Sequence, residues 1–310
     1  MTQYQPPVSK KADDEIDLRE LFKVIWQGKR VIIAVTFVFA VASVFYALSL
    51  PNIYKSEALL APASEQKMSG LSGQLGGLAA LAGVSLGSGS ADNTALALEI
   101  IKSRDFIGRF IERHNILVDL MASEEWDMNS NTLIYSSAIY DVETQTWTRT
   151  VEPPFNSKPS IQEAHRVFLE KFSVMQDKDS GMILISIQHL SPYIAQQWLS
   201  WLIEDINQEM KIRDIKEAER SIVYLQKQIQ ETNISDVKAA LFSLIEEQTK
   251  SLMLANVRDE YVLKVVDSPM VPEQRDSPKR ALICLLITFL GSIFSVFFVL
   301  LVNMFRKDDE

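Results

Sequence analysis

The three histidines are the side chains best suited to acid–base chemistry or metal binding near neutral pH. His114, His165 and His189 stand far apart in the sequence, and no pair has the i, i+4 spacing around a glutamate that marks a metalloprotease helix. We therefore interpret each histidine as an ordinary surface or packed residue. The sequence predicts no metal site and no cofactor.

The other reactive side chains are equally scattered. The single cysteine, Cys284, lies in a long apolar run, so the polar part of the chain has no thiol nucleophile and can form no disulfide. Glu124-Glu125 and Glu246-Glu247 are adjacent pairs, and neighbours in a strand or helix point apart, which favours solvated charges over a glycosidase pair. We expect no catalytic residues and no enzymatic activity.

Two short motifs point to chemistry but fail on inspection. A phosphate-binding loop needs Gly, four residues and then Gly-Lys-Ser/Thr, whereas Gly28-Lys29 is followed by arginine and preceded by no glycine. Nucleotide binding through that loop is excluded. Asn233-Ile234-Ser235 matches a glycosylation acceptor, but it follows a long helical stretch and is better interpreted as a turn in which Ser235 caps the next helix.

Two uncharged apolar runs, 31–50 and 281–305, frame the polar chain. A hydrocarbon core of roughly 30 Å needs about 20 helical residues, and both runs reach that length. The sequence predicts two transmembrane helices, with residues 51–280 on one side of the bilayer and residues 1–30 and 306–310 on the other. The first run is too long, and too far from the N-terminus, to be typical of a cleaved signal peptide.

Basic residues set the orientation of these helices. Arg19, Lys23, Lys29 and Arg30 precede the first run, against Lys55 alone in a similar stretch after it. The short ends are therefore predicted to be cytoplasmic and the bulk of the chain periplasmic or extracytoplasmic. Basic residues flank the second run on both sides, so they do not indicate its orientation.

Composition limits the partners of this bulk. The 310 residues leave room for one soluble domain between the runs, and a net charge of −9 with a pI near 5.1 argues against nucleic acid. Before the first run, apolar residues at helical spacing predict an amphipathic helix on the inner membrane surface or a helical extension of the first span. Those apolar residues are Leu18, Leu21, Phe22 and Ile25. The glycine-rich stretch 70–89 is interpreted as a mobile loop with apolar anchors.

The polar region reads as an α/β base with a helical arm. Strands are predicted at about 53–61, 171–176, 182–188 and 261–267, the middle two as a hairpin. Helical spacing runs through 92–114, as two helices or as one bent at Ser103, and Ser160 with Glu163 forms a capping box before another helix. Residues 124–159 are expected to be irregular with short strands.

The predicted arm spans about 192–254. Ser191-Pro192 opens its first helix, which reaches about residue 231. An apolar stripe on this helix needs a partner helix, and the next helix can supply it within the chain, while contact with a neighbouring subunit is a compatible use. The stripe consists of Ile215, Ile222, Leu225 and Ile229, with Ala218 between them. The second helix offers Val237, Leu241, Leu244 and Leu252.

Several motifs are spread along nearly the whole chain. They are residues 14–21, Pro51 with Tyr54, Ile139-Tyr140-Asp141 with Trp147, Ser268-Pro269-x-x-Pro272 and Ser277-Pro278-Lys279-Arg280. The most specific is the proline-rich segment before the second run, where Pro269, Pro272 and Pro278 fix backbone angles and forbid helix, so that the domain is expected to meet the membrane at a set angle. With these motifs the chain resembles the Wzz-type polysaccharide chain-length determinants, the kinase-free group of polysaccharide co-polymerases.

The resemblance implies a two-pass protein of the bacterial inner membrane, with its bulk in the periplasm. It implies a homo-oligomeric ring without catalytic residues that sets the length of O-antigen lipopolysaccharide or a related glycan. Its implied partners are an inner-membrane polymerase, the growing glycan and the lipid bilayer. Small residues in the spans offer close helix contact, between the spans or with the polymerase; they are Ser43 and Ala47 in the first and Gly291 and Ser295 in the second.

Two other classes of function stay open at this point. An export scaffold or adaptor for exopolysaccharide or capsule also uses an anchored helical hairpin, although the second span and the proline-rich segment count against it. A membrane-bound glycan-modifying enzyme would have to turn over polysaccharide with no polymerase present.

Overall fold

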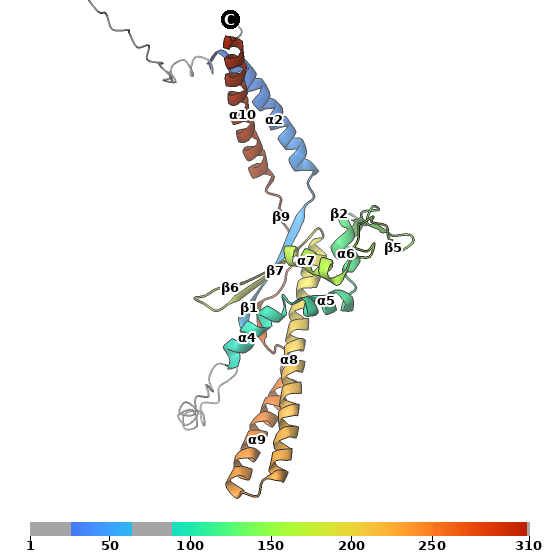
Figure 1. Ribbon diagram of the computed structural model, residues 1–310, viewed down its shortest axis with the longest axis vertical. Coiled ribbons are helices and arrows are strands. Elements are labelled where there is room, and N and C mark those ends of the chain that lie inside the picture. Colours follow the sequence, from blue (N-terminus) through green and yellow to red (C-terminus); the bar gives the residue numbers. More distant parts are fainter. Residues whose placement is uncertain (1–25, 64–88, 309–310) are drawn as a thin grey trace, which may run out of the picture. The chain divides into compact units, whose positions relative to one another are not determined.

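The computed structural model describes residues 26–63 and 89–308 (Figure 1). The chain forms two compact units, one made of residues 1–51 with 277–310 and the other of residues 52–276. The amphipathic helix expected before the first apolar run and almost all of the glycine-rich stretch 70–89 lie outside the described residues.

The first unit is a pair of apolar helices, α2 (Lys29–Ser49) and α10 (Arg280–Asp308), which pack against each other. Lys29–Ser49 and Arg280–Asn303 have mean hydropathies of 2.6 and 2.7, so both are long and apolar enough to cross a membrane. Helix α2 ends where Leu50 turns extended, because the residue before a proline disfavours helical backbone.

The second unit is built on an antiparallel sheet in the order β6-β7-β1-β8, with β9 also paired to β1. Tyr54 of β1 lies opposite His189 of β7, and Leu60 lies opposite Ile183. Every second side chain of β1 is buried, which gives the sheet one core face. The strands are β1 (Ile53–Pro62), β6 (Phe172–Gln176), β7 (Ile183–His189), β8 (Leu263–Asp267) and β9 (Arg275–Ser277).

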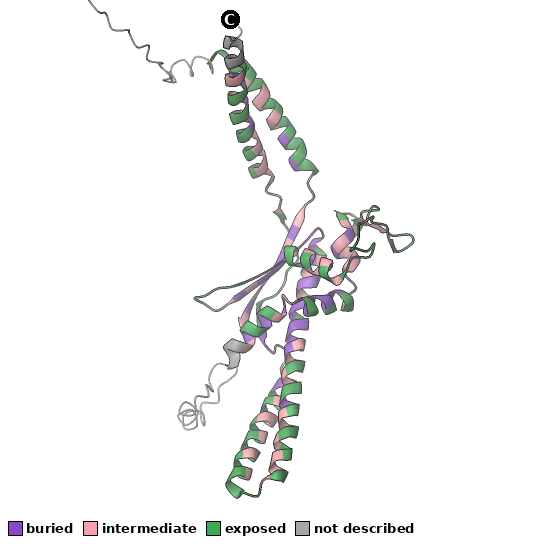
Figure 2. Ribbon diagram, viewed as in Figure 1, coloured by how far each residue is buried: buried purple, intermediate pink, exposed green. Residues whose placement is uncertain are grey.

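Helices cover this core face. The first half of α8 (Pro192–Glu231) packs on β1 and β7, and its Trp198, Leu199 and Leu202 are among the most buried residues of the core. Figure 2 shows the buried residues gathered where α8 crosses the sheet. Four shorter helices pack around this centre: α4 (Gly89–Ile100), α5 (Arg104–Arg113), α6 (Leu117–Ala122) and α7 (Ile161–Lys171).

Helix boundaries follow local signals in the sequence. Ser103 separates α4 from α5 by accepting a hydrogen bond from the Phe106 N–H, so the predicted helical region is two helices. Asn115, with a φ of 52°, stops α5 in the left-handed conformation that asparagine tolerates. The capping box of Ser160 and Glu163 at the start of α7 is confirmed, as is the cap of Ser191 with Pro192 in the first turn of α8.

Three hairpins of this unit share one turn chemistry. In each, an aspartate ends or follows the first strand and accepts the backbone N–H two residues later: Asp127 from Asn129, Asp141 from Glu143 and Asp177 from Asp179. A residue with positive φ closes each turn, respectively Asn131, Gln145 and Gly181. Hydrogen bonds from Ser130, Thr144 and Ser180 keep the pKa of these three aspartates below its ordinary value.

Two of these hairpins fill the region predicted as irregular. They are β2 (Ser123–Asp127) with β3 (Thr132–Tyr135) and β4 (Tyr140–Asp141) with β5 (Thr146–Trp147). The third joins β6 to β7, as predicted from the sequence.

The helical arm is the second half of α8 together with α9 (Ser235–Val257), which run side by side beyond the sheet (Figure 1). The prediction that Ser235 caps α9 is wrong. Ile234 takes the extended capping position without a side-chain bond, and Ser235 is already in the first helical turn.

A second correction concerns the face that α9 turns to α8. Val237 and Leu244 were expected to pack against α8, but they are 42% and 45% exposed. The partly covered apolar residues of α9 are Leu241, Ile245 and Leu252, spaced by four and seven, which follows the helical period more closely than the predicted set.

Candidate functional site

Within residues 26–63 and 89–308, no three His, Cys, Asp or Glu side chains gather into a possible metal site. His114 stacks on Trp201 with ring centroids 4.3 Å apart, His165 contacts the Lys102 carbonyl at 2.9 Å, and His189 is buried. The paired glutamates on β2 and α9 are exposed. The candidate functional features are therefore packing surfaces, and they occur in the helix pair, the arm and the core beneath the arm.

The helix pair has its small residues at the contact between α2 and α10. Ser43 and Ala47 of α2 are 1% and 2% exposed, and Ser295 of α10 is fully buried with its hydroxyl 3.4 Å from that of Thr36. These are buried positions in a unit whose other apolar side chains mostly face outward, so close backbone approach holds the pair together.

Gly291 of α10 lies directly against Phe39 of α2. A Cβ atom built on Gly291 would stand 2.6 Å from the Cβ and Cγ atoms of Phe39. Any side chain here must push the helices apart or displace the phenylalanine ring. Beside the contact, an open groove of about 530 Å³ is lined by Ala40, Ser43, Val44, Cys284, Leu285, Thr288, Phe289 and Ser292.

The three prolines lie in the segment between β8 and α10, which is non-helical throughout. The carbonyl of Pro269 accepts a bond from the Gln196 side chain at 3.4 Å, and the next carbonyl, of Met270, accepts one from Ser56 at 2.8 Å. Pro272 precedes β9, and Pro278 follows it, two residues before α10 begins. Backbone carbonyls of the segment thus bind it to the sheet and to α8. Proline can take part in such contacts because it lacks only the N–H and keeps its carbonyl.

Along the arm, Ile215, Ile222, Leu225 and Ile229 are each partly buried, and Ala218 between them is 5% exposed. These residues repeat every three or four positions and form the face of α8 that lies toward α9. In a hairpin of two helices, only α9 covers these side chains of α8, so the stripe stays half-buried.

The root of the arm carries a polar clasp that the sequence analysis missed. Asn207 is buried in α8, and its Oδ1 accepts the N–H groups of Val262 and Leu263 at 2.8 and 2.9 Å, while its Nδ2 donates to the carbonyls of Ile203 and Leu263. These four bonds use the full hydrogen-bonding capacity of the amide. By taking these two N–H groups, Asn207 fixes the start of β8 at Leu263, two residues later than predicted.

Three further hydrogen bonds secure the same root. The Tyr261 hydroxyl donates to Asp214 at 2.6 Å, and Lys211 donates to the carbonyls of Asn256 and Arg258 at the end of α9. Burial raises the pKa of Asp214 despite the tyrosine bond. One feature of the sequence could have predicted these contacts. Asn207 is a polar residue at a position of α8 where the helical repeat otherwise places apolar residues.

His189 is the most strongly perturbed imidazole of the described chain. It is 1% exposed, its Nδ1 accepts the Ser191 N–H at 3.1 Å, and its Nε2 lies 3.4 Å from the Asp119 carbonyl. Burial, with a smaller contribution from the charge of Lys171, lowers the pKa of His189 to about 4. The ring is therefore neutral in the folded protein at pH 7, with its proton on Nε2.

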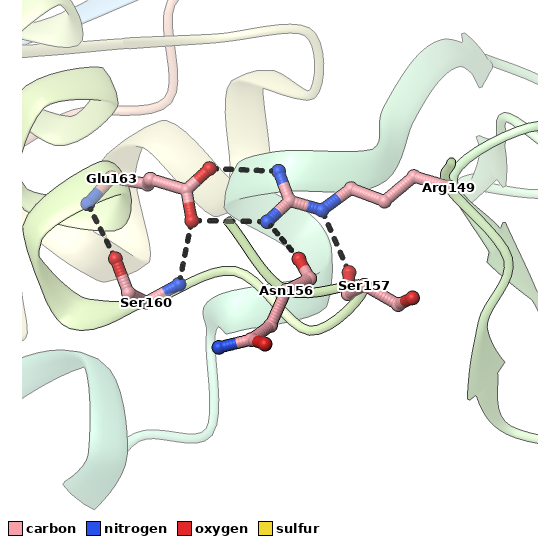
Figure 3. A network of polar contacts seen from close by, with 5 residues as sticks. All are labelled: Arg149, Asn156, Ser157, Ser160 and Glu163. Atoms are coloured by element: carbon pink, nitrogen blue, oxygen red, sulfur yellow. Dashed lines mark hydrogen bonds and ion pairs between the residues drawn. The ribbon is translucent and has the colours of Figure 1, made fainter. Parts of the chain in front are cut away.

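Arg149 and Glu163 form the best-satisfied ion pair (Figure 3). The guanidinium bonds both carboxylate oxygens at 2.9 and 3.0 Å and also the carbonyls of Ser157 and Asn156, while Glu163 accepts the Ser160 N–H. The bonds from Arg149 lower the pKa of Glu163 to about 2. This network fastens the loop before α7 to the start of that helix, which is a structural role.

Comparisons with known proteins find one matching family model and one similar curated protein. Residues 14–114, about a third of the chain, match the family model "Wzz: Chain length determinant protein". A stretch of 56 residues is 36% identical to the ferric enterobactin transport protein FepE of Escherichia coli (strain K12), and it spans 18% of this chain and 15% of that protein. The resemblance to the chain-length determinants is thereby confirmed.

Solved structures give matches over most of the chain. A full-length bacterial polysaccharide co-polymerase is 17% identical, with 94% of this chain and 99% of that chain covered and a TM-score of 0.42. A fragment of WzzB, a polysaccharide co-polymerase from Salmonella Typhimurium, is 12% identical, with 73% and 100% covered and a TM-score of 0.29. A Wzz dodecamer fitted to a cryo-EM map is 16% identical, with 72% and 100% covered and a TM-score of 0.23.

Proposed function

We propose that this chain, which resembles the Wzz chain-length determinants, regulates the length of a bacterial polysaccharide, O-antigen lipopolysaccharide or a related glycan. It acts as a non-catalytic homo-oligomeric co-polymerase beside an inner-membrane polymerase. The match of residues 14–114 to the chain length determinant family carries this proposal. The match covers the first apolar helix and extends through β1 to α5, so it includes both the membrane anchor and part of the α/β base.

The proposal places the chain in the inner membrane as a two-pass protein, with residues 51–280 in the periplasm. In support, the two apolar helices pack as a pair, and a basic cluster precedes the first of them. In this setting the small residues Ser43, Ala47, Gly291 and Ser295 serve the pairing of the spans, and the prolines 269, 272 and 278 keep the segment before the second span stiff.

Chemistry supports a regulator over an enzyme. A glycan-modifying enzyme needs acid–base carboxylates 5 to 10 Å apart around a sugar, by general rule. Of the acidic side chains described above, Asp127, Asp141 and Asp177 lie in turns, Glu163 pairs with Arg149, and Asp214 accepts the Tyr261 hydroxyl at the root of the arm. The protein would thus act on the polymerase and the growing glycan through its assembled shape.

Deletion of the gene in the bacterium that encodes it tests this function. The length distribution of the glycan, resolved on a gel, should broaden while polymer is still made, and a plasmid copy should restore the original distribution. An unchanged ladder, or complete loss of the glycan, would contradict length control. Unchanged lengths with less polysaccharide at the cell surface would instead indicate an export scaffold.

A further inference from the structure

Six tyrosine and tryptophan side chains gather in two groups at the hairpins β2–β3 and β4–β5, next to α6 (Figure 1). In each group one ring contacts two others, with ring centroids 5.1 to 6.3 Å apart. Hairpin β2–β3 joins the groups, because Trp126 lies opposite Leu133, and Tyr135, two residues further along β3, is on the same face. We call these six residues the aromatic cluster: Tyr54, Trp126 and Tyr193 in one group, and Tyr135, Tyr140 and Trp147 in the other.

Most of the aromatic cluster lies outside the hydrophobic core. Tyr193 is 51% exposed, and of the other five residues only Tyr54 is buried. The motif of Tyr140 and Trp147, noted in the sequence, therefore has no part in the main core. Each partly exposed ring is held by contact with its neighbours, so it loses little conformational freedom when a partner binds. Rings of this kind commonly form binding surfaces, because an apolar body and a polar tip are presented together.

Polar groups accompany these rings. Within residues 26–63 and 89–308, the hydroxyls of Tyr54 and Tyr140 and the indole N–H of Trp147 have no hydrogen-bond partner, and none of the three is buried. They are thus available to a ligand as donors, and the two hydroxyls also as acceptors. Exposed amide and hydroxyl side chains lie on the same hairpins: Asn129, Asn131, Thr132, Thr144, Gln145 and Thr146.

The charge of this region limits the class of ligand. Residues 123–159 contain six acidic and two basic side chains, and one of the two cations, Arg149, is paired with Glu163. A surface of this sign repels nucleic acid and anionic lipid. A pyranose ring has an apolar C–H face that stacks on an aromatic ring, and its hydroxyls exchange hydrogen bonds with phenols, amides and carboxylates. The surface therefore suits a sugar polymer with few anionic groups.

We propose that the aromatic cluster binds the growing polysaccharide, with sugar rings stacked on Tyr193 in one group and on Trp147 in the other. The inference rests on the proposed function, which makes a polysaccharide the polymer that this chain regulates, and it names the surface that touches this polymer. Because hairpin β2–β3 joins the two groups, one glycan chain can engage both, and its weak contacts then add. A glycan long enough to reach both groups is held more tightly than a shorter one.

Isothermal titration calorimetry of the full chain in detergent tests the site. The probe is the surface polysaccharide of the bacterium that encodes the chain, freed of lipid by mild acid and separated into size fractions. Tyr193→Ala and Trp147→Ala should each raise the dissociation constant about tenfold. Longer fractions should bind wild type more tightly than short ones, and this length dependence should be lost in both variants. The matched control Tyr224→Ala, at a residue 63% exposed on the arm, should bind like wild type.

Tyr193→Ala keeps the test valid if Trp147→Ala loses its hairpin. Tyr193 belongs to the first turn of α8, outside both hairpins, and half of its surface is already exposed, so its removal should leave the fold intact. Urea unfolding of each variant shows whether this holds. If the polysaccharide does not bind, or binds wild type and Tyr193→Ala equally, the glycan site is refuted.

Two measurements on the same variants test other occupants of this surface. In vesicles of brominated phosphatidylethanolamine, quenching of the fluorescence that Trp147→Phe removes would show that the cluster lies in the membrane. A smaller native particle mass for Tyr193→Ala or Trp147→Ala would show that it joins neighbouring copies. Either result would overturn the glycan site, whereas an unquenched Trp147 and an unchanged mass support it.

The gene deletion keeps this inference separate from the function on which it rests. If deletion broadens the glycan ladder but Tyr193→Ala and Trp147→Ala bind polysaccharide like wild type, only the aromatic site is refuted. If deletion leaves the ladder unchanged while both variants bind more weakly than wild type, length control is refuted and the glycan site stands.

Discussion

Acid should destabilise this protein through His189. The imidazole is neutral and buried in the folded state, with a pKa of about 4 against an ordinary value of 6.5. As the pH falls below 6.5, the imidazole binds a proton in the unfolded chain but stays neutral in the folded chain. The free energy of unfolding therefore decreases, and the decrease is complete below about pH 4. Above pH 6.5 the imidazole is neutral in both states, so its pKa shift does not change the free energy of unfolding.

The size of the effect follows from the shift and from the local geometry. Each pKa unit corresponds to about 1.4 kcal/mol, so the full shift is worth about 3 kcal/mol, a large part of the total stability of a typical domain. The structure explains the sign because protonation would place a second N–H donor on Nδ1, which now accepts the Ser191 N–H at 3.1 Å. The nearby charge of Lys171 opposes protonation further.

The assay is urea unfolding of the full chain in detergent between pH 7.5 and 4.5, followed by tryptophan fluorescence. Trp198, with its ring centroid 4.8 Å from that of His189, reports on this part of the core. The variant His189→Gln should remove most of the pH dependence between 6.5 and 4.5, and the control His165→Gln should keep it. Burial raises the pKa of Asp119, and this carboxyl acts in the opposite direction, so the difference between variants is the quantity to compare.

A second variant guards against a failure of His189→Gln to fold. Lys171→Met removes the neighbouring charge, so His189 would protonate more easily in the folded state. The total loss of stability in acid should therefore be smaller, and the acid unfolding of the protein should shift toward lower pH. Equal pH dependence in wild type and His189→Gln, with no change in Lys171→Met, would refute the reasoning.

Three further substitutions have outcomes fixed by single contacts. Asn207→Ala leaves two buried backbone N–H groups without their acceptor and should cost about 3 kcal/mol of unfolding free energy in the same urea assay. Glu163→Gln should cost about 2 kcal/mol near neutral pH, and the difference from wild type should shrink as the pH falls from 4.5 to about 2, since the native carboxylate is then protonated. Gly291→Leu should separate the two apolar helices. In a Ser43→Cys background this separation should lower the yield of the disulfide between positions 43 and 284, because the Ser43 carbonyl is 3.7 Å from the Cys284 sulfur in the native pair.

Each of these changes has a matched control in the same element or the same residue type. Asn233→Ala, in the exposed turn of the arm, should leave stability unchanged within about 0.5 kcal/mol. Glu170→Gln, at the exposed end of α7, should show no comparable pH-dependent loss. Leu290→Ala, beside the glycine but 62% exposed, should preserve the helix pair and its disulfide yield.

Features encoded within a few residues could be predicted from the sequence. The start of α8 needs only Ser191 and Pro192, the start of α7 needs only Ser160 and Glu163, and the break at Ser103 needs one hydroxyl at the right offset. The two apolar helices could also be predicted, because their length and lack of charge are local properties of the sequence.

Features that depend on distant parts of the chain could not be predicted in the same way. The start of β8 is set by Asn207, whose acceptor reaches residues more than fifty positions later in the sequence. The error at Val237 and Leu244 has the same origin, because several apolar stripes are available on α9 and only the position of α8 decides which one is covered. The acid sensitivity of His189 likewise comes from burial between β7, α6 and α8, not from its neighbours in sequence.

The arm shows why local pattern and tertiary role diverge in this protein. Its inner seam is only half-buried, and Val223, Tyr224, Phe242 and Met253 remain exposed on its outer faces. A hairpin with so little covered surface gains little stability by itself, so its position must be fixed at the root by polar contacts such as the Asn207 clasp and the Tyr261–Asp214 bond.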